Sequence, residues 1–574
     1  MSHLALSAFL LLLAWLTVPP ESWLGAATQP YDLLIKGGQV IDGSGNPAFR
    51  ADVAVRGDRI AAVGRGLQGT AVRIIDAAGQ VVTPGFIDLQ GSPFGVLVDG
   101  RAESKVRQGV TTEVFGESGS AGPVLGPAVA PMQDYLDPTG IQVDWSTLDG
   151  YFRRIQRQGT ALNIASYVGV GQLRLSVMGN VDRPPTDQEM ERMESLLAQA
   201  MEEGALGLSS GLPYPPNSYA SRRETILLAR VAARYGGIYA THMRSEGSRI
   251  LEALDEAISV GEEAGLPVHI AHLKVTGRNM WGRMGIVIEH ISRARSRGVE
   301  LTAYQYPYLA GMGPLQKCIP PRFQQGTATD LANLLGQDRV REQIRQAIEN
   351  GEPGWESNVV ALTGGFEGIV LASVRKPENK IYEGRTLHQV ASLTKKDPVD
   401  ALLDLLVSEE GKYTPALFFH MSEEDVRLAM KQPWVAVGSD GIAVSPSLRS
   451  LGRAHPRFYG TYPRILGHYV REKGVLSLAD AVRKMTSLPA QIVGLPDRGL
   501  LKPGMAADLV IFDPESVNDR ATFEQPDHFP DGISFVVVNG RLVVADGEQT
   551  EALPGKVLYG PGRHPSIAEE LRAR

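Results

Sequence analysis

Tyr239-Ala-Thr-His242-Met-Arg, Val268-His-Ile-Ala-His272-Leu-Lys274 and Val437-Gly-Ser-Asp440-Gly are the stretches of sequence that decide the fold. Each is a short apolar run that leads to a side chain able to bind a metal ion or to move a proton. Short apolar runs of this kind predict buried parallel strands. In a βα barrel, chemistry is carried where the strands end, so we expect His242, His272 and Asp440 to lie close together there.

Around these stretches, apolar runs alternate with amphipathic segments at 187–203, 221–235 and 250–264. This alternation is typical of an α/β fold with a parallel sheet. It predicts a (β/α)8 TIM-like barrel over residues 86–490. The polar segment at about 318–365 interrupts the alternation, and we interpret it as an inserted subdomain.

Both ends of the chain carry strand-like runs separated by glycine-rich turns. Residues 28–85 contain Asp32-Leu-Leu-Ile, and residues 491–574 contain Asn539-Gly540, which is a hairpin signal. We expect the two ends to build one small composite β-sandwich domain, followed by a C-terminal tail.

The N-terminus has the features of an export signal. Residues 4–18 are apolar, too few to span a bilayer comfortably, and small residues suited to cleavage follow at Gly25-Ala26-Ala27. We interpret residues 1–27 as a signal peptide of a periplasmic or secreted protein, with no stable membrane span after its removal. Met1-Ser-His contains no basic residue, so an uncleaved anchor stays as the alternative.

The composition indicates a soluble enzyme with a small-molecule substrate. At 574 residues the chain exceeds one ordinary core, and 43% hydrophobic with 21% charged residues excludes a disordered chain. A net charge of −7 offers no basic surface for nucleic acid. The single cysteine, Cys318, excludes disulfides within the chain. The oligomeric state stays open.

Several longer motifs follow one another along nearly the whole chain. They include Gln108-Gly-Val-Thr-Thr, Gly204-Ala-Leu-Gly-Leu-Ser-Ser-Gly-Leu-Pro-Tyr214, Tyr306-Pro-Tyr-Leu-Ala-Gly, Gly438-Ser-Asp-Gly and His455-Pro-Arg457. Their order resembles that of the amidohydrolase superfamily, and specifically its D-aminoacylase (N-acyl-D-amino-acid deacylase) branch.

This resemblance implies a metal centre. Its ligands would be His242, His272 and Glu117, which stands where the family usually has a cysteine. A carboxylate can replace a thiolate at zinc because both are anionic. We expect one divalent ion, with zinc as the first choice. Asp440 corresponds to the family's general base, which takes a proton from the attacking water and passes it to the leaving amine.

The resemblance also implies a place for the substrate's carboxylate. Arg457 matches the family residue that pairs with this group, and a guanidinium offers it two parallel donors. Tyr214 and Lys274 match family positions near the same carboxylate. Tyr306 is a further substrate-binding candidate, although the local Tyr-Gln-Tyr-Pro-Tyr leaves its register open by a residue or two.

Departures from the family pattern argue against a second metal. Gln90 and Ser92 replace the two histidines of an N-terminal HxH pair, Val170 stands where a histidine is frequent, and Ser245 replaces an acidic residue. A single ion on three protein ligands still leaves an open position for water, as a catalytic site requires.

The sequence therefore predicts metal-dependent hydrolysis of the amide bond of N-acyl-D-amino acids, giving a carboxylate and a free D-amino acid. A D-amino-acid-containing dipeptidase or a cyclic-amide hydrolase would use the same attacking water and stays open. A degenerate, non-catalytic exported binding protein is the alternative outside the enzymes. Acyl group, side chain, stereochemistry and metal identity carry no readable signal in the sequence.

Overall fold

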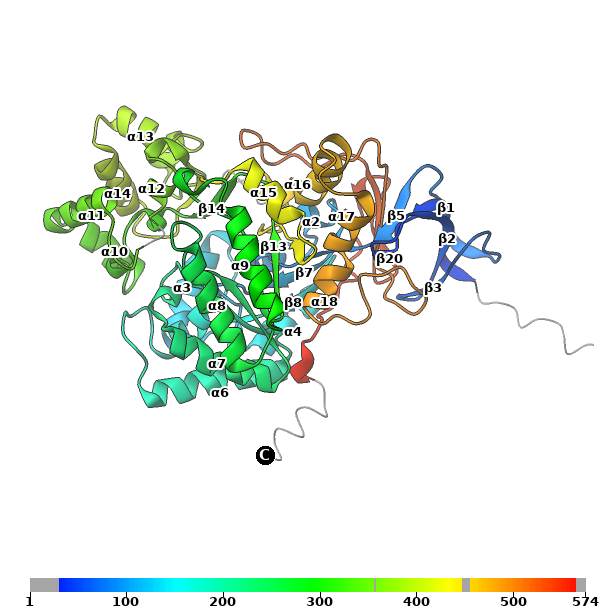
Figure 1. Ribbon diagram of the computed structural model, residues 1–574, viewed down its shortest axis with the longest axis horizontal. Helices are drawn as coiled ribbons and strands as arrows, with labels where there is room; N and C mark the ends of the chain where they lie inside the picture. Colours follow the sequence, from blue (N-terminus) through cyan, green and yellow to red (C-terminus); the bar gives the residue numbers. More distant parts are fainter. Residues whose placement is uncertain (1–29, 356–357, 446–454, 564–574) are drawn as a thin grey trace, which may run out of the picture.

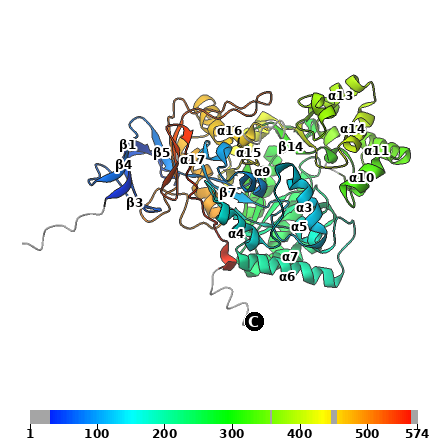
Figure 2. The same ribbon diagram turned by 180° about the vertical axis from the view of Figure 1, so that it is seen from behind.

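The computed structural model describes residues 30–355, 358–445 and 455–563. The predicted signal peptide, residues 1–27, lies outside this range. The strands from the two chain ends lie together on one side, parallel strands with their helices form the middle, and a helical lobe lies on the opposite side (Figures 1 and 2).

The two ends of the chain share one nine-stranded sheet. Its order is β21-β20-β19-β18-β5-β1-β2-β3, with β4 paired to β1. The strands are β1 (Tyr31–Val40), β2 (Phe49–Arg56), β3 (Arg59–Gly64), β4 (Ala71–Asp76), β5 (Val81–Pro84), β18 (Leu509–Phe512), β19 (Ile533–Val538), β20 (Arg541–Ala545) and β21 (Glu548–Gln549). The antiparallel pair of β5 and β18 joins the halves, so both ends do meet in one unit. Its arrangement as a sandwich stays a prediction.

The middle of the molecule consists of parallel strands in two sheets. One has the order β6-β7-β8 and the other β17-β13-β12-β11-β10-β9. The strands are β6 (Phe86–Asp88), β7 (Val110–Phe115), β8 (Asn163–Ser166), β9 (Val168–Gly169), β10 (Gly207–Gly211), β11 (Ile238–His242), β12 (Val268–Ile270), β13 (Leu301–Gln305) and β17 (Val435–Val437). Among the described residues no strand ladder joins β17 to β6, so closure of an eight-stranded barrel stays a prediction.

Helices connect the parallel strands, as the amphipathic segments predict. The longest is α6 (Asp187–Glu203), which begins at a capping box of Thr186 with Glu189 and ends at Gly204 in the left-handed region (φ 109°). The others around the strands are α1 (Pro93–Val98), α2 (Glu103–Val106), α3 (Val129–Leu136), α4 (Leu148–Gln158), α5 (Val170–Val177), α7 (Arg222–Arg234), α8 (Ile250–Ala264), α9 (Met284–Ser296), α15 (Glu423–Met430), α16 (Arg457–Arg464), α17 (Leu478–Met485) and α18 (Ser487–Ile492).

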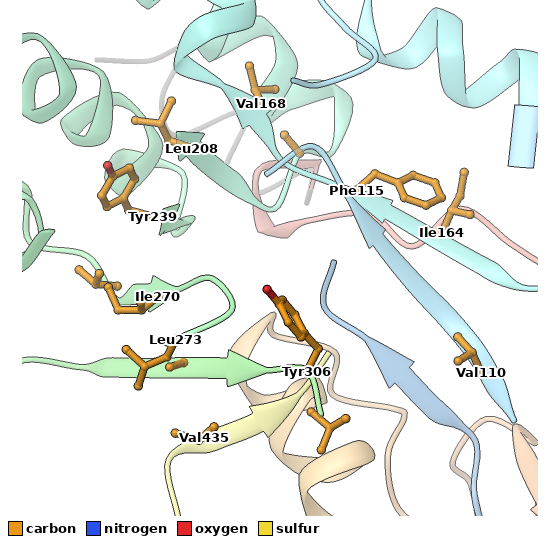
Figure 3. Packing of buried hydrophobic residues seen from close by; sticks show 14 of the residues in the cluster. Val110, Phe115, Ile164, Val168, Leu208, Tyr239, Ile270, Leu273, Tyr306 and Val435 are labelled. Atoms are coloured by element: carbon orange, nitrogen blue, oxygen red, sulfur yellow. The ribbon is translucent and has the colours of Figure 1, made fainter. Parts of the chain in front are cut away.

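Each parallel strand is buried on both faces, which explains the continuous apolar runs. Figure 3 shows one face, where Val110 of β7, Ile164 of β8, Leu208 of β10 and Ile270 of β12 belong to one large hydrophobic cluster. The opposite face belongs to a separate cluster that includes the small side chains of Ala165, Ala240, Ala271 and Ala436. This packing fixes the strand ends, and with them the residues that follow.

The helical lobe has a core of its own, which runs from Leu315 to Phe418. It contains an antiparallel sheet of β14 (Ala310–Pro314), β16 (Pro415–Phe419) and β15 (Ile369–Leu371), with the short helix η6 (Leu315–Cys318) and helices α10 (Ala328–Leu335), α11 (Asp338–Asn350), α12 (Val359–Leu362), α13 (Leu387–Thr394) and α14 (Pro398–Ser408). The lobe thus extends beyond the predicted insert at 318–365. Helices α13 and α14 are amphipathic like those around the strands, so their sequence alone does not reveal that they pack on a different core.

None of the helices in the three described ranges combines the length and the hydropathy needed to cross a membrane.

Candidate active site

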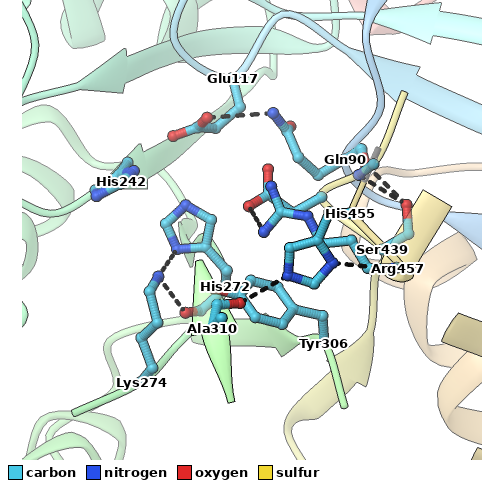
Figure 4. A network of polar contacts seen from close by, with 12 residues as sticks. Gln90, Glu117, His242, His272, Lys274, Tyr306, Ala310, Ser439, His455 and Arg457 are labelled. Atoms are coloured by element: carbon cyan, nitrogen blue, oxygen red, sulfur yellow. Dashed lines mark hydrogen bonds and ion pairs between the residues drawn. The ribbon is translucent and has the colours of Figure 1, made fainter. Parts of the chain in front are cut away.

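The three predicted metal ligands come together at the ends of the parallel strands (Figure 4). Glu117 follows β7 after Gly116, His242 is the last residue of β11, and His272 lies just beyond β12. One ligand atom from each residue lies within 4.8 Å of the others, and all three residues are buried. They can therefore share one ion.

The protonation of the two histidines suits a cation. Burial lowers the pKa of His242 to about 4 and that of His272 well below its usual range, so both imidazoles are neutral at pH 7. Burial, and next the nearby Asp440 charge, raise the pKa of Glu117 well above its usual value, and a bound cation would oppose this shift by favouring the carboxylate. Glu117 Oε1 has no hydrogen-bond partner among the described residues. Two neutral imidazoles and a carboxylate with a free oxygen are a donor set that fits a divalent ion such as zinc.

A fourth residue, Glu246, contacts both histidines. The sequence did not predict it as part of the site. Its Oε2 lies 3.6 Å from His242 Nε2, and its Oε1 lies 3.1 Å from His272 Nδ1. Burial would raise the pKa of Glu246, but the Lys274 ammonium, with the two histidines, holds it well below its usual range. The available signal was its position four residues after His242 within the motif.

Lys274 lies at the site but is engaged by protein groups. Its Nζ lies 2.6 Å from Glu246 Oε1 and 2.7 Å from His272 Nδ1, and it donates to the His272 carbonyl oxygen at 3.1 Å. Lys274 therefore orients the ligand side of the site (Figure 4). Its predicted role toward a substrate carboxylate stays a prediction.

Asp440 and Arg457 form an ion pair beside the three ligands. Asp440 follows β17 with a left-handed backbone (φ 48°), and Arg457 begins α16. Arg457 Nη1 lies 2.8 Å from Asp440 Oδ2. Burial raises the pKa of Asp440 even though Arg457 favours its charged form. Arg457 Nε has no hydrogen-bond partner among the described residues, so it keeps one donor available for a substrate.

His455 fixes the start of the helix that carries Arg457. Its Nε2 lies 2.9 Å from the carbonyl oxygen of Ala310 on β14, and its Nδ1 accepts from Arg457 N at 2.9 Å. These contacts require a neutral imidazole with the proton on Nε2, which agrees with the strongly lowered pKa that burial gives His455. The helical lobe and α16 are thereby tied together next to the site.

Both predicted tyrosines line the site. The Tyr214 ring meets the His242 ring edge-on at 5.2 Å between centroids. Tyr306 lies 6.3 Å from the His272 ring, with the Arg457 guanidinium 4.8 Å from its centroid. Tyr304, two residues earlier, also lies 5.9 Å from the His272 ring, so two tyrosines of the ambiguous stretch contact this ligand.

Gln90 and Ser92 are engaged in structural contacts. Gln90 Nε2 donates to Glu117 Oε2 at 3.2 Å, and Ser92 Oγ caps α1 by accepting from Phe94 N. Val170 is buried at the start of α5. None of the three offers an imidazole, and the single-ion site stays a prediction.

A buried charge cluster supports the loop that carries Asp440, and nothing in the sequence pattern indicated it. Lys105 Nζ lies 2.7 Å from Asp88 Oδ2 and 2.9 Å from Glu113 Oε1, and all three side chains are fully buried. Lys105 also donates to Ser439 Oγ at 2.6 Å, and Asp88 Oδ1 accepts from Ser439 N at 2.8 Å. The cluster thus links β6, α2 and β7 to the residue before Asp440.

With this geometry established, comparison with known proteins assigns the family. Residues 73–544 match the model of the Amidohydrolase family. The chain is a member of the Amidohydrolase family. This confirms the resemblance inferred from the motifs and the expected amidohydrolase-type α/β fold.

Three relatives illustrate where this amidohydrolase lies in the family. It is 37% identical to a D-aminoacylase of Alcaligenes xylosoxydans xylosoxydans over 534 residues, 92% of this chain and 98% of that protein. A D-aminoacylase structure from work on its binuclear metal centre, with one-metal activation and second-metal attenuation, has a TM-score of 0.77 at 35% identity, covering 92% and 100% of the two chains. An N-acyl-D-glutamate deacylase of Bordetella bronchiseptica, complexed with zinc and a phosphonate mimic of the tetrahedral intermediate, has a TM-score of 0.77 at 32% identity, covering 93% and 100%.

Proposed function

We propose that this amidohydrolase hydrolyses the amide bond of N-acyl-D-amino acids with one divalent metal ion, expected to be zinc. The observation that carries the proposal is the buried triad of Glu117, His242 and His272 with Asp440 beside it. The similarity to D-aminoacylase and to N-acyl-D-glutamate deacylase supports this choice of substrate class.

Different residues of the chain carry out different steps of the reaction. Glu117, His242 and His272 would hold the ion, which when bound lowers the pKa of water and polarises a carbonyl oxygen. Asp440 accepts a proton from the attacking water and delivers it to the amide nitrogen as the carbon–nitrogen bond breaks. The products are a carboxylic acid and a free amino acid, so water is the only co-reactant.

The remaining residues orient the base and the substrate. Arg457 holds Asp440 through Nη1 and offers Nε to the α-carboxylate of the substrate. Tyr214 and Tyr306 line the same space, and Lys274 keeps Glu246 against His272. Each group is set by strand ends or by packed loops, which favours a preorganised site.

The finer points of architecture and location are proposals as well. We propose that the parallel strands close into an eight-stranded barrel, which the Ser439–Asp88 hydrogen bond between the ends of β17 and β6 supports. We propose that the nine-stranded sheet packs as a sandwich around its own hydrophobic cluster. We also propose export to the periplasm or the medium, from the apolar stretch at 4–18.

A metal and substrate screen tests the function. We expect about one ion per chain by elemental analysis and turnover of N-acetyl-D-amino acids in preference to L isomers, dipeptides and cyclic amides. The Asp440→Asn variant should keep its metal and lose about 10²- to 10⁴-fold in kcat. Stoichiometric metal without turnover of any of these substrates would contradict the proposal. Ligand binding without metal, unchanged in Asp440→Asn, would favour the non-catalytic binding protein.

A further inference from the structure

Lys317 is a cation at the active site that the motifs did not reveal. It lies on η6 of the helical lobe, directly after β14. Its Nζ lies 3.3 Å from the Tyr214 hydroxyl, 5.0 Å from the Tyr214 ring centroid and 5.8 Å from the Phe418 ring centroid. Tyr214 itself contacts the ring of His242. One aromatic side chain therefore separates this ammonium from the metal ligands.

Lys317 differs from the other two cations of the site because it lacks an anion. Lys274 is paired with Glu246, and Arg457 with Asp440. Within the described ranges, no carboxylate lies within ion-pair distance of Lys317, and its contacts are the Tyr214 hydroxyl and two aromatic rings. Burial lowers the pKa of Lys317 to about 8. A partly buried ammonium of this kind gains most from an anion that arrives with a ligand.

Two glycines lie on the strand next to Lys317. Gly311 and Gly313 lie two residues apart on β14, so they face the same side. A Cβ at Gly313 would lie 3.4 Å from Lys317 Cδ and 3.6 Å from the Tyr214 hydroxyl. A Cβ at Gly311 would lie 3.0 Å from His420 Nε2 and 3.5 Å from the Tyr306 hydroxyl. The two glycines thus bring buried backbone without side chains close to the hydroxyls of Tyr214 and Tyr306.

A polar ring with one unpartnered nitrogen lies beside Gly311, toward which it directs Nε2. His420 is 4% exposed, and its Nδ1 has no hydrogen-bond partner among the described residues. Burial lowers its pKa to about 3, so the ring is neutral and can donate or accept one hydrogen bond. The lobe therefore places both a charge and a polar ring close to Tyr214 and Tyr306.

We infer that Lys317 binds a carboxylate on the side chain of the substrate, in addition to the α-carboxylate that Arg457 binds. The enzyme would then prefer N-acylated acidic D-amino acids. This rests on the proposed function. The α-carboxylate already has the free Nε of Arg457, which leaves Lys317 for another anion. An apolar substrate side chain at this place would cover the ammonium without pairing it, which is unfavourable. A side-chain carboxylate pairs it and accepts from the Tyr214 hydroxyl.

The test compares two substrates of equal shape, N-acetyl-D-glutamate and N-acetyl-D-glutamine, which differ only in the charge of the side chain. We expect the zinc-loaded enzyme to prefer the glutamate derivative in kcat/KM. Lys317→Gln should lose about 10-fold or more on N-acetyl-D-glutamate, as for a charged hydrogen bond, and change less than about 2-fold on N-acetyl-D-glutamine. Lys317→Arg should retain the preference. Lys473→Gln, on an exposed surface, is the matched control and should change neither value.

A binding measurement separates recognition from turnover. In the Asp440→Asn background, calorimetry should show tighter binding of N-acetyl-D-glutamate than of N-acetyl-D-glutamine, and Lys317→Gln should remove the difference. Equal losses on both substrates, no loss on either, or a wild-type preference for the neutral substrate would each overturn the inference. Failure of the proposed function is distinguishable, because the wild-type enzyme would then cleave neither substrate nor other N-acyl-D-amino acids.

Discussion

At the scale of single residues, the site depends on side chains that hold the metal ligands in place. Glu246 contacts both histidines, and such a carboxylate fixes which imidazole nitrogen carries the proton. Glu246→Gln should therefore weaken metal affinity about 10- to 100-fold, measured by competition with a chelator.

A neighbouring histidine provides the control for this variant. His269 lies on β12 beside the ligand His272 but bonds to Thr302 Oγ1 at 2.9 Å instead. His269→Asn should leave the metal affinity within about 2-fold of wild type. If Glu246→Gln binds metal as tightly as His269→Asn does, Glu246 does not orient the ligands.

The charge of Lys317 predicts a pH dependence of specificity. Burial lowers its pKa to about 8, so the side chain is cationic below that pH and neutral above it. The titratable groups that act on it are Glu246, Lys274, Asp440 and the adjacent Cys318, whose thiol burial keeps neutral. The ratio of kcat/KM for N-acetyl-D-glutamate over N-acetyl-D-glutamine should fall as pH rises through about 8, because kcat/KM reports the free enzyme. A ratio that stays constant from pH 7 to 9.5 would argue against this charge, whereas Lys317→Arg should give just such a constant ratio.

At the scale of elements, the charge cluster of Lys105 joins α2 to β6, to β7 and to the loop after β17. Removing one member leaves buried charges without a partner, which costs about 3–5 kcal/mol. Lys105→Met should lower the free energy of unfolding by that amount in urea titrations. Adding Glu113→Gln to it should recover part of the loss, since burial already raises the pKa of Glu113 to about 7. A single variant as stable as wild type would show that the cluster does not hold these elements together.

At the scale of the whole molecule, the sheet shared by the two chain ends holds the N-terminal and C-terminal segments together. Strand β5 pairs with β18, and the cluster around Val53 and Ile511 draws residues from both ends. Deletion of residues 491–574 removes β18 to β21 and exposes this cluster, so we expect insoluble protein or no cooperative thermal transition. Deletion of 564–574, which retains every described strand, should melt like the full chain. A soluble, cooperatively folded 1–490 fragment would contradict this role.

The candidate site was predicted in part. The motifs located Glu117, His242, His272 and Asp440, because each lies where an apolar run ends. Glu246, Lys317 and Lys105 were missed, because a buried or paired charge has the same local sequence as a solvated one. Their roles follow from contacts with residues on other elements, which no spacing in the chain encodes.

The sequence by itself determined the local structure. The apolar runs form parallel strands, and amphipathic segments such as 187–203 form helices. The candidate metal-binding side chains lie at the ends of the strands. Only the tertiary structure decided that 366–418 belongs to the lobe, that Arg457 pairs with Asp440 and that Lys317 lies without an anion beside Tyr214. The physical reason is the distance along the chain over which each signal acts. The periodicity of apolar residues reports only which face one element buries. Strand pairing and charge compensation depend on which element, distant in the sequence, packs against that face.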